Sequence, residues 1–256
     1  MTNGSITESA LQDQVVLVTG ASSGLGRASA LAFAQAGADV ALLARSEREL
    51  QVVADEVEKL GRRALALPID LSDEAAVLTA AERTVSTLGR IDVLLNNAGT
   101  DVPGSVTALS VDDWDLVLAV NLRAPFLLAK SVFPTMQAQG RGTIINVSSV
   151  AGKRGWANAS AYCASKFGLT GFTQALHAEG KEHGIRAVVV YPGAMATNWG
   201  DWTPEARQAD EQESRPSSEA LSPEDAASFL VWLAAAPQTM VLTETVMMPL
   251  KEQGWP

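Results

Sequence analysis

The stretch TGASSGLG, from Thr19 to Gly26, follows the apolar run VVLV and precedes a helix-like segment rich in alanine. Gly20 can take the positive φ angle of a tight turn, Gly24 lets backbone approach a pyrophosphate, and Gly26 lets helix and strand pack closely. The free N–H groups and the positive dipole end of the helix would then face phosphate oxygens. The order of strand, glycine-rich turn and helix therefore predicts a nucleotide-phosphate site.

Apolar runs and helix-like segments alternate along the rest of the chain. Strands are expected at about residues 15–18, 40–44, 64–67, 91–95, 143–147, 185–191 and 240–247. Helices are expected at about 25–37, 50–60, 72–89, 111–139, 162–179 and 222–233, with the long helix broken or kinked near Pro125 and Pro134. This alternation predicts an α/β, single-domain, doubly wound Rossmann fold, whose seven-stranded, mainly parallel sheet has helices on both faces.

The domain organisation follows from the same pattern. Residues 1–13 are expected to form a flexible N-terminal arm, and residues 14–256 form the single domain. Residues 194–221 show no clear period, and we expect them to form a flap over the substrate.

Composition narrows the classes of partner. With 19 basic and 29 acidic residues, the net charge is −10 at pH 7, which would not attract nucleic acid or an anionic membrane. The N-terminal segment is polar, no apolar run is expected to reach membrane-spanning length, and Cys163 is the single cysteine. We therefore expect a cytoplasmic protein that binds neither nucleic acid nor membrane, and no motif suggests a bound metal.

Tyr162 and Lys166 lie four residues apart in a predicted helix, so their side chains share one face. An ammonium near a phenol stabilises the phenolate and lowers the tyrosine pKa from its usual value of about 10. We therefore expect Tyr162 to act as a general acid or base. The alternative is a surface pair without chemistry.

Two further positions carry polar side chains that the chemistry could use. Ser148 and Ser149 both follow the strand at 143–147, at the edge where parallel sheets bind ligands, and residue chemistry alone does not choose between them. Asn121 lies inside a helical pattern although asparagine is a poor helix former. Asn121 is either an exposed residue beside the kink at Pro125 or a residue that the chemistry of the site uses.

The spacing TGxxxGxG, with NNAG at 96–99, the pair Tyr162 and Lys166, and YPG at 191–193, resembles the classical short-chain dehydrogenase/reductase family. The resemblance spans residues 15–197, and it implies an oxidoreductase that uses a nicotinamide dinucleotide. It implies that Ser149, thirteen residues before the tyrosine, polarises the substrate carbonyl. It also implies that Asn121 distorts its helix and holds a water beside Lys166.

The resemblance implies a set of cofactor contacts. They are Gly20, Ser22, Ser23, Gly24, Leu25 and Gly26 in the turn, Asp70 and Leu71 at the adenine, Asn97, Ala98 and Gly99 on the adenine and ribose side, and Tyr162, Lys166, Pro192, Gly193 and Thr197 at the nicotinamide end. The C-terminus, MMPLKEQGWP, departs from the glycine pair that follows the last strand in many relatives.

The end of the second strand bears on the choice of cofactor. An NAD site needs a carboxylate there for the adenosine ribose, and Ala44 cannot supply it. Arg45, with Ser46 beside it, can pair with a 2′-phosphate, so NADP is expected and NAD is the less favoured cofactor. Asp39 precedes the strand and belongs to the opposite sheet edge.

The expected function is that of an NADP(H)-dependent carbonyl reductase or secondary alcohol dehydrogenase, which transfers hydride between nicotinamide and a small-molecule ketone. A 3-oxoacyl-carrier-protein reductase also fits the motifs, although its acidic carrier is a poor match for a net charge of −10. A non-catalytic NADP-sensing regulator would not need a proton donor. The family resemblance further implies a homotetramer or homodimer.

Aromatic residues suggest the kind of ketone. Trp199 and Trp202 lie in the flap, and Trp156 lies in the loop between Ser149 and Tyr162. The residues expected to line the substrate site are Ser149, Ala151, Trp156, Tyr162, Trp199 and Trp202. Such a pocket suits bulky or aryl ketones, whereas the alternative is that the tryptophans pack in a subunit interface or cover the sheet.

Overall fold

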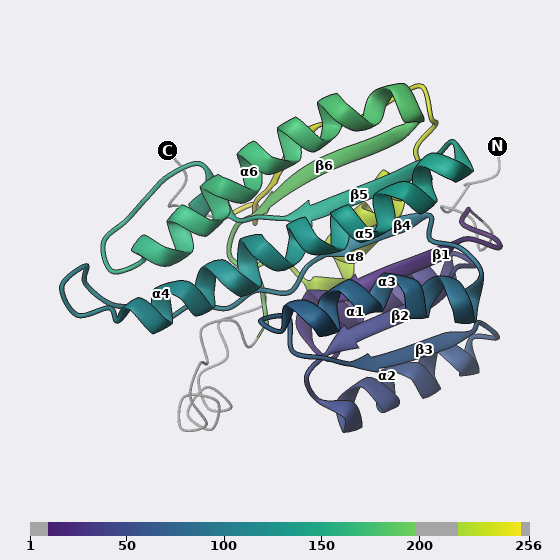
Figure 1. The fold of residues 1–256 in the computed structure, drawn as a ribbon, viewed down its shortest axis with the longest axis horizontal. Coiled ribbons are helices and arrows are strands. Elements are labelled where there is room, and N and C mark those ends of the chain that lie inside the picture. Colours follow the sequence, from purple (N-terminus) through teal and green to yellow (C-terminus); the bar gives the residue numbers. More distant parts are fainter. Residues whose placement is uncertain (1–9, 198–219, 252–256) are drawn as a thin grey trace.

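A computed structural model describes residues 10–197 and 220–251. Seven strands form one sheet in the order β3-β2-β1-β4-β5-β6-β7, and every strand pair described is parallel. The strands are β1 (Val15–Thr19), β2 (Asp39–Ala44), β3 (Ala64–Pro68), β4 (Val93–Asn96), β5 (Gly142–Val147), β6 (Ile185–Pro192) and β7 (Glu244–Met247). The chain runs outward from β1 to β3 and then crosses back to β4, which lies beside β1 (Figure 1). The predicted doubly wound fold is confirmed, and ligands bind such sheets at this switch in direction.

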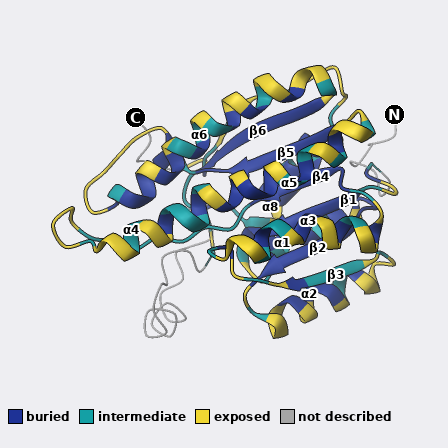
Figure 2. Cartoon of the chain, viewed as in Figure 1, coloured by how far each residue is buried: buried dark blue, intermediate teal, exposed yellow. Residues whose placement is uncertain are grey.

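Helices cover both faces of the sheet. They are α1 (Gly24–Gln35), α2 (Glu47–Lys59), α3 (Glu74–Leu88), α4 (Val111–Leu118), α5 (Ala124–Gln139), α6 (Ser160–Gly180) and α8 (Pro223–Ala235), with the short turns η1 (Ala119–Arg123), η2 (Val150–Gly152) and η3 (Lys181–His183). Val16 and Val18 of β1 pack with α1, α2 and α8, whereas Val15 and Leu17 pack with α3 and α5. Figure 2 shows the buried strands between helices whose outer sides are exposed. The four apolar residues at the start of β1 therefore pack into two cores, one on each face of the sheet.

Four helices begin at a residue whose side chain accepts a hydrogen bond from the helix backbone. These residues are Ser46, Asp73, Ser110 and Ser222, at the starts of α2, α3, α4 and α8. Such caps satisfy N–H groups that have no partner within the helix. The sequence predicted a start at Ser72, but Asp73 caps α3, since the Ser72 hydroxyl donates to Asp70 at 2.8 Å.

The helix predicted over 111–139 is continuous but contains a π-helical turn, η1. The irregularity lies just before Pro125, which is in the first turn of α5, while Pro134 stays inside α5. The whole stretch, Val111–Gln139, is long and apolar enough to cross a membrane by length and composition, so the prediction that no run reaches that length is wrong. Leu128 and Val132 are nevertheless buried against the sheet, which accounts for the apolar character of α5.

The N-terminal arm and the start of the last strand differ from the prediction, apart from shifts of a few residues at other element ends. Residues 1–9 of the predicted arm lie outside the described residues, but Leu11 is fully buried and its N–H donates to the Ala36 carbonyl at 2.9 Å. β7 begins at Glu244 rather than Met240, because Met240 closes a turn and its carbonyl accepts from Arg186 at 3.2 Å. Both differences come from contacts with residues far away in the sequence.

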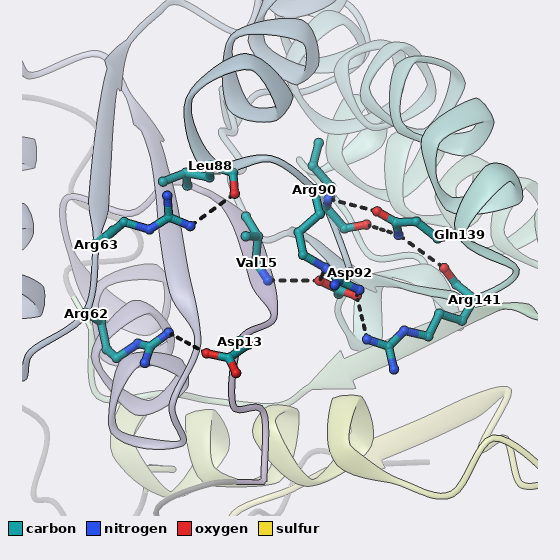
Figure 3. Close-up of polar contacts among 10 residues, drawn as sticks. Asp13, Val15, Arg62, Arg63, Leu88, Arg90, Asp92, Gln139 and Arg141 are labelled. Atoms are coloured by element: carbon teal, nitrogen blue, oxygen red, sulfur yellow. Dashed lines mark hydrogen bonds and ion pairs between the residues drawn. The ribbon is translucent and has the colours of Figure 1, made fainter.

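The amino ends of the strands carry ion pairs rather than ligand-binding groups. Asp39 is the first residue of β2, lies in register with Val15, and pairs with Arg62 at 2.9 Å and Arg63 at 2.7 Å. Figure 3 shows this edge, where Asp92 accepts a hydrogen bond from the Val15 backbone at 3.0 Å. The prediction that Asp39 lies at the edge away from the cofactor turn is confirmed, but the prediction that it precedes the strand is wrong, because Asp39 already pairs in register with Val15 of β1.

Candidate active site

Four adjacent strands bring the predicted site residues to one edge of the sheet. β1, β4, β5 and β6 are parallel neighbours, so their carboxyl ends meet. The glycine turn follows β1, Asn97 follows β4, Ser149 follows β5 and Gly193 follows β6. Residues far apart in the sequence therefore share one edge.

The glycine turn needs its glycines for conformation and for space. Gly20 has a φ of +67° and Gly24 a φ of +52°, values that side chains with a Cβ rarely adopt. A Cβ on Gly26 would lie 2.1 Å from the Gly20 carbonyl oxygen. The roles predicted for Gly20 and Gly26 agree with this geometry, and Gly24 is needed for its positive φ as well.

The helix that follows the turn fits a phosphate group. Ser23 is the N-cap of α1, yet α1 has no side-chain hydrogen bond at this cap and no acid in its first turn. In α2, α3, α4 and α8, by contrast, a side chain caps the first turn and an acidic residue lies within it. The N-terminus of α1 thus lacks the side-chain oxygen that caps those four helices, and an anion such as a dinucleotide pyrophosphate suits it. Ser22 and Leu25 lie in the same turn.

Thr19, the last residue of β1, connects the glycine turn to the two residues after β4, a role that the sequence analysis missed. Its Oγ1 accepts from the backbone N–H of Asn97 at 2.9 Å and of Ala98 at 3.0 Å, and its carbonyl accepts from Asn97 Nδ2 at 3.0 Å. Asn97, predicted as a cofactor contact, therefore also binds the backbone at the start of the glycine turn. The available signal was the threonine itself, at the carboxyl end of a strand adjacent to β4. Gly99 follows, half-buried.

Asn96 connects β4 to the neighbouring strand through its side chain. Its Nδ2 donates to Asn146 Oδ1 at 2.8 Å, and Asn146 Nδ2 donates to Thr173 Oγ1 of α6 at 2.8 Å. All three side chains are buried. A polar chain thus crosses from β4 through β5 to the helix that carries Tyr162.

The two serines after β5 have different surroundings. Ser148 is buried and its hydroxyl donates to the Lys166 carbonyl at 3.3 Å. The Ser149 side chain is hydrogen-bonded to Tyr162, and its Oγ accepts from the Ala151 N–H at 3.2 Å. The structure therefore favours Ser149 as the serine that meets substrate.

Burial decides the protonation of the Tyr162 and Lys166 side chains. It raises the pKa of Tyr162 above its usual value; the hydrogen bond with Ser149 opposes this rise, and the negative charge of Asp101 adds to it. Burial also lowers the pKa of Lys166 to about 8. The lowered tyrosine pKa expected from Lys166 is therefore wrong for this structure, because desolvation of the phenolate outweighs the nearby ammonium, which lies 5.6 Å from the ring centre. The phenol is protonated at neutral pH.

Lys166 is held by the strand beside it. Its Nζ donates to the Val147 carbonyl at 2.9 Å, and its side chain is buried. The ammonium thus stays at the carboxyl end of β5, within reach of a ligand on the same edge.

Asn121 is fully buried in the π-helical turn η1, which excludes the exposed alternative. Its Nδ2 donates to the Thr100 carbonyl at 2.8 Å and to Ser165 Oγ at 3.1 Å, and its Oδ1 accepts from the Thr100 N–H at 2.8 Å. Ser165 Oγ donates in turn to the Tyr162 carbonyl at 2.7 Å. The expected helix distortion is confirmed, and the water beside Lys166 stays a prediction. Thr100 and Ser165 are site residues that the sequence did not reveal.

A family model described as short chain dehydrogenase matches residues 14–208. The chain belongs to the short chain dehydrogenase family. Two relatives are the (2S)-((R)-hydroxy(phenyl)methyl)succinyl-CoA dehydrogenase subunit BbsD of Thauera aromatica, 35% identical over 88% of this chain and 90% of that protein, and the 3-oxoacyl-(acyl-carrier-protein) reductase FabG of Thermotoga maritima, 34% identical over 92% and 96%. A crystal structure of a metagenomic short-chain oxidoreductase in complex with NADP is similar, with a TM-score of 0.81 and 35% identity over 94% of this chain and 99% of that one.

In this short chain dehydrogenase, the predicted adenosine contacts lie beyond β2 and β3. Arg45 is exposed, and its positive charge contributes to lowering the pKa of Asp70. The main cause of that lowering is the hydrogen bond from the Ser72 N–H to Asp70 at 2.8 Å. Ser46 Oγ accepts from the backbone of α2, and Leu71 is buried. Arg45 and Asp70 thus lie close enough for their charges to interact, and both residues are exposed.

The segment after β6 approaches the glycine turn. Pro192 ends the strand, and the Gly193 N–H donates to the Met247 carbonyl at 2.8 Å. The Thr197 methyl lies 3.3 Å from the point that a Cβ on Gly24 would occupy. Thr197 is therefore next to the predicted pyrophosphate site.

The substrate-lining predictions are only partly covered by the structure. Trp199 and Trp202 lie outside the described residues, whereas Trp156 is 48% exposed in the loop before α6. Ala151 is fully buried in a cluster with Tyr162, Ala159 and Cys163, so its predicted substrate contact stays a prediction and its packing supports the tyrosine. Residues 198–219 of the predicted flap lie outside the described residues. The residues on either side of them are hydrogen-bonded, since the Leu221 carbonyl accepts from the Ala196 N–H at 2.9 Å.

Proposed function

We propose that this oxidoreductase is an NADP(H)-dependent carbonyl reductase or secondary alcohol dehydrogenase. The observation that carries the proposal is the hydrogen-bonded pair of Ser149 and Tyr162, with Lys166 beside it, on the sheet edge that also carries the glycine turn. When bound, a reduced nicotinamide supplies the hydride for the carbonyl carbon.

The side chains of the protein bind and protonate the carbonyl oxygen. Ser149 Oγ donates a hydrogen bond to that oxygen, and the Tyr162 hydroxyl gives it a proton as negative charge develops. Burial keeps the phenol protonated at neutral pH, so it is ready as a donor. The Lys166 ammonium then stabilises the phenolate that remains. Alcohol oxidation needs the phenolate from the start and is therefore favoured at higher pH.

The test is turnover of a panel of ketones, from small aliphatic to aryl, followed by the loss of NADPH absorbance. Turnover of at least one class supports the proposal. Tight NADPH binding without turnover of any ketone or alcohol would instead favour the NADP-sensing regulator.

The preference for NADP rests on the end of β2. Ala44 stands where a carboxylate would accept from the ribose of NAD, and exposed Arg45 can meet a 2′-phosphate. The similar metagenomic oxidoreductase was solved with NADP.

We further propose that the protein is cytoplasmic. Cys163 is the single cysteine, which suits a reducing compartment.

The relatives support two substrate classes. The name of BbsD includes a hydroxyl and a phenyl group on the same carbon, in keeping with a bulky or aryl ketone here. The FabG relative supports an acyl-carrier-protein substrate as the second candidate. If the first is right, Trp199→Ala or Trp202→Ala raises KM for large ketones more than for small ones. Equal effects on both sizes would contradict an aromatic flap.

We further propose that the chain forms a homo-oligomer through α4, α5 and α6. Three large apolar side chains on these helices are exposed, Leu116 at 41%, Phe126 at 45% and Phe167 at 47%. A hollow of about 900 Å³ is lined by Leu116 and Phe126 together with other residues of α4, η1 and α6. A second copy of this chain would cover such a face, since apolar contact stabilises association in proportion to the area removed from water.

The oligomer can be tested by light scattering during size-exclusion chromatography. Phe126→Asp should yield a smaller species than the wild type, whereas Val52→Asp, at an exposed apolar position on α2, should not. A monomeric wild type would overturn this part of the proposal.

A further inference from the structure

A polar cluster outside the catalytic residues joins four elements at the β7 edge of the sheet. Lys153 Nζ lies 2.6 Å from Glu244 Oε2 and 4.2 Å from the centre of the Tyr191 ring. The Tyr191 hydroxyl donates to Glu244 Oε2 at 3.3 Å, and Gln174 Nε2 donates to Glu244 Oε1 at 2.8 Å. Both oxygens of Glu244, on β7, are therefore engaged by the loop after β5, by β6 and by α6.

One end of this cluster is attached to the short turn that begins at Ser149. The Gly152 N–H donates to the Ser149 carbonyl at 2.8 Å, and the Lys153 N–H donates to the Val150 carbonyl at 3.0 Å. Because Lys153 directly follows this turn, an anchor on its side chain restrains the backbone that positions Ser149.

The other end is attached to the helix of the catalytic tyrosine. Tyr162, Lys166, Thr170 and Gln174 follow one another at intervals of four, so they form a stripe along one side of α6. Thr170 Oγ1 donates to the Lys166 carbonyl at 3.0 Å and lies 3.5 Å from the Gly152 carbonyl. The stripe thus runs from the catalytic pair to the residue that binds Glu244.

The charges in the cluster are stable over a wide pH range. The Lys153 hydrogen bond lowers the pKa of Glu244, and the Glu244 hydrogen bond raises the pKa of Lys153. Their side chains are about one-third exposed, at 33% and 32%, where an ion pair adds little to folding stability. Geometry rather than stability is the main consequence of the pair.

We propose that Lys153 and Glu244 are positioning residues, which fix the Ser149 turn against α6 and so set the contact between Ser149 and Tyr162. This inference rests on the function proposed above. It also makes the last strand of the sheet a support of the reacting groups, although β7 contributes none of them. Small displacements of reacting groups reduce rates strongly, by about a hundredfold for 1 Å in sensitive cases.

The test compares Lys153→Met, Glu244→Gln and the double variant with the wild type in steady-state ketone reduction. Each single variant should lower kcat about tenfold with KM for NADPH unchanged, because the cofactor turn is untouched. The double variant should be no slower than the worse single variant, since the two residues act as one unit. The control is Arg141→Met, which removes an ion pair to Asp92 at the amino ends of the strands, where Asp92 keeps its pair with Arg90; its kcat should stay within twofold of the wild type.

A second measurement does not depend on turnover. Amide hydrogen exchange at Gly152 and Lys153 should be at least about tenfold faster in Lys153→Met and Glu244→Gln than in Arg141→Met. Unchanged exchange, or unchanged kcat in correctly folded single variants, would overturn the positioning role. Faster exchange in a protein that reduces no ketone would contradict the proposed function and leave the anchor supported.

Discussion

The side-chain amide of Asn121 donates a hydrogen bond to Ser165 Oγ at 3.1 Å, and this contact joins the π-helical turn to the helix that carries Tyr162. The same amide satisfies both the N–H and the carbonyl of Thr100. One side chain in η1 therefore connects the loop after β4 with α6, next to Tyr162 and Lys166.

Asn121→Ala should destabilise the protein by about 1–3 kcal/mol, because it leaves polar groups of Thr100 and Ser165 without this partner in a buried site. Ser165→Ala removes only one of these contacts and should be milder. Urea unfolding of both variants gives the comparison. Equal stability of Asn121→Ala and wild type would show that water replaces the amide.

Tyr162→Phe should lower kcat at least about a hundredfold while NADP still binds, because it removes the proton donor and little else. Stopped-flow measurement of the first turnover separates chemistry from release, and NADPH fluorescence titration checks binding. Near wild-type turnover would rule out Tyr162 as the acid.

Ser149→Ala and its neighbour Ser148→Ala form a matched pair. Ser149→Ala should lower kcat by about ten- to a thousandfold, because the carbonyl oxygen loses a donor. Ser148→Ala loses a contact to the Lys166 backbone and should change kcat less than about threefold. A larger loss at Ser148 would reverse the assignment of the two serines.

Stability should rise with pH because of Lys166. Its pKa is lowered to about 8 in the folded chain from a usual value of 10.5, so the unfolded chain binds more protons between these values and the free energy of unfolding increases with pH there. From pH 7.5 to 9.5 the gain is on the order of 1–2 kcal/mol relative to Lys166→Met, in which this group is absent. Parallel unfolding curves for both proteins across that range would mean that the lysine does not lose its proton on burial.

Cofactor preference should respond to the end of β2. Ala44→Asp combined with Arg45→Ala should move the ratio of kcat/KM values from NADPH towards NADH by at least about tenfold, since a carboxylate repels the 2′-phosphate and accepts from the ribose. Arg48→Ala, on the exposed first turn of α2, is the matched control for loss of a basic residue. A wild-type enzyme that prefers NADH would contradict the interpretation of Arg45.

Local sequence predicted the parts of the fold that local chemistry determines. The run VVLV before TGASSGLG is typical of a buried parallel strand, and it forms one. The positive φ of Gly20 follows from the tight turn that begins there. Tyr162 and Lys166 could be paired from helical spacing alone. Such features need no knowledge of distant contacts.

Features that depend on distant contacts could not be predicted. The raised pKa of Tyr162 comes from burial by surrounding residues, and the late start of β7 reflects the hydrogen bond from Arg186 to Met240. The contact between Asn97 and Thr19 could not be predicted either, because nothing in the sequence shows that the two residues lie side by side. The cofactor contact of Asn97 stays a prediction.

The contact between Thr19 and Asn97 also sets an order of events during synthesis. Leu17 of β1 pairs with Leu94 of β4, so the two strands meet only after the whole first half of the sheet has been made. A nascent chain that ends before Asn97 contains the complete glycine turn but lacks its brace. The glycine turn of a nascent chain should therefore gain this contact only once β4 and the residues just after it leave the exit tunnel, and before Tyr162 is translated.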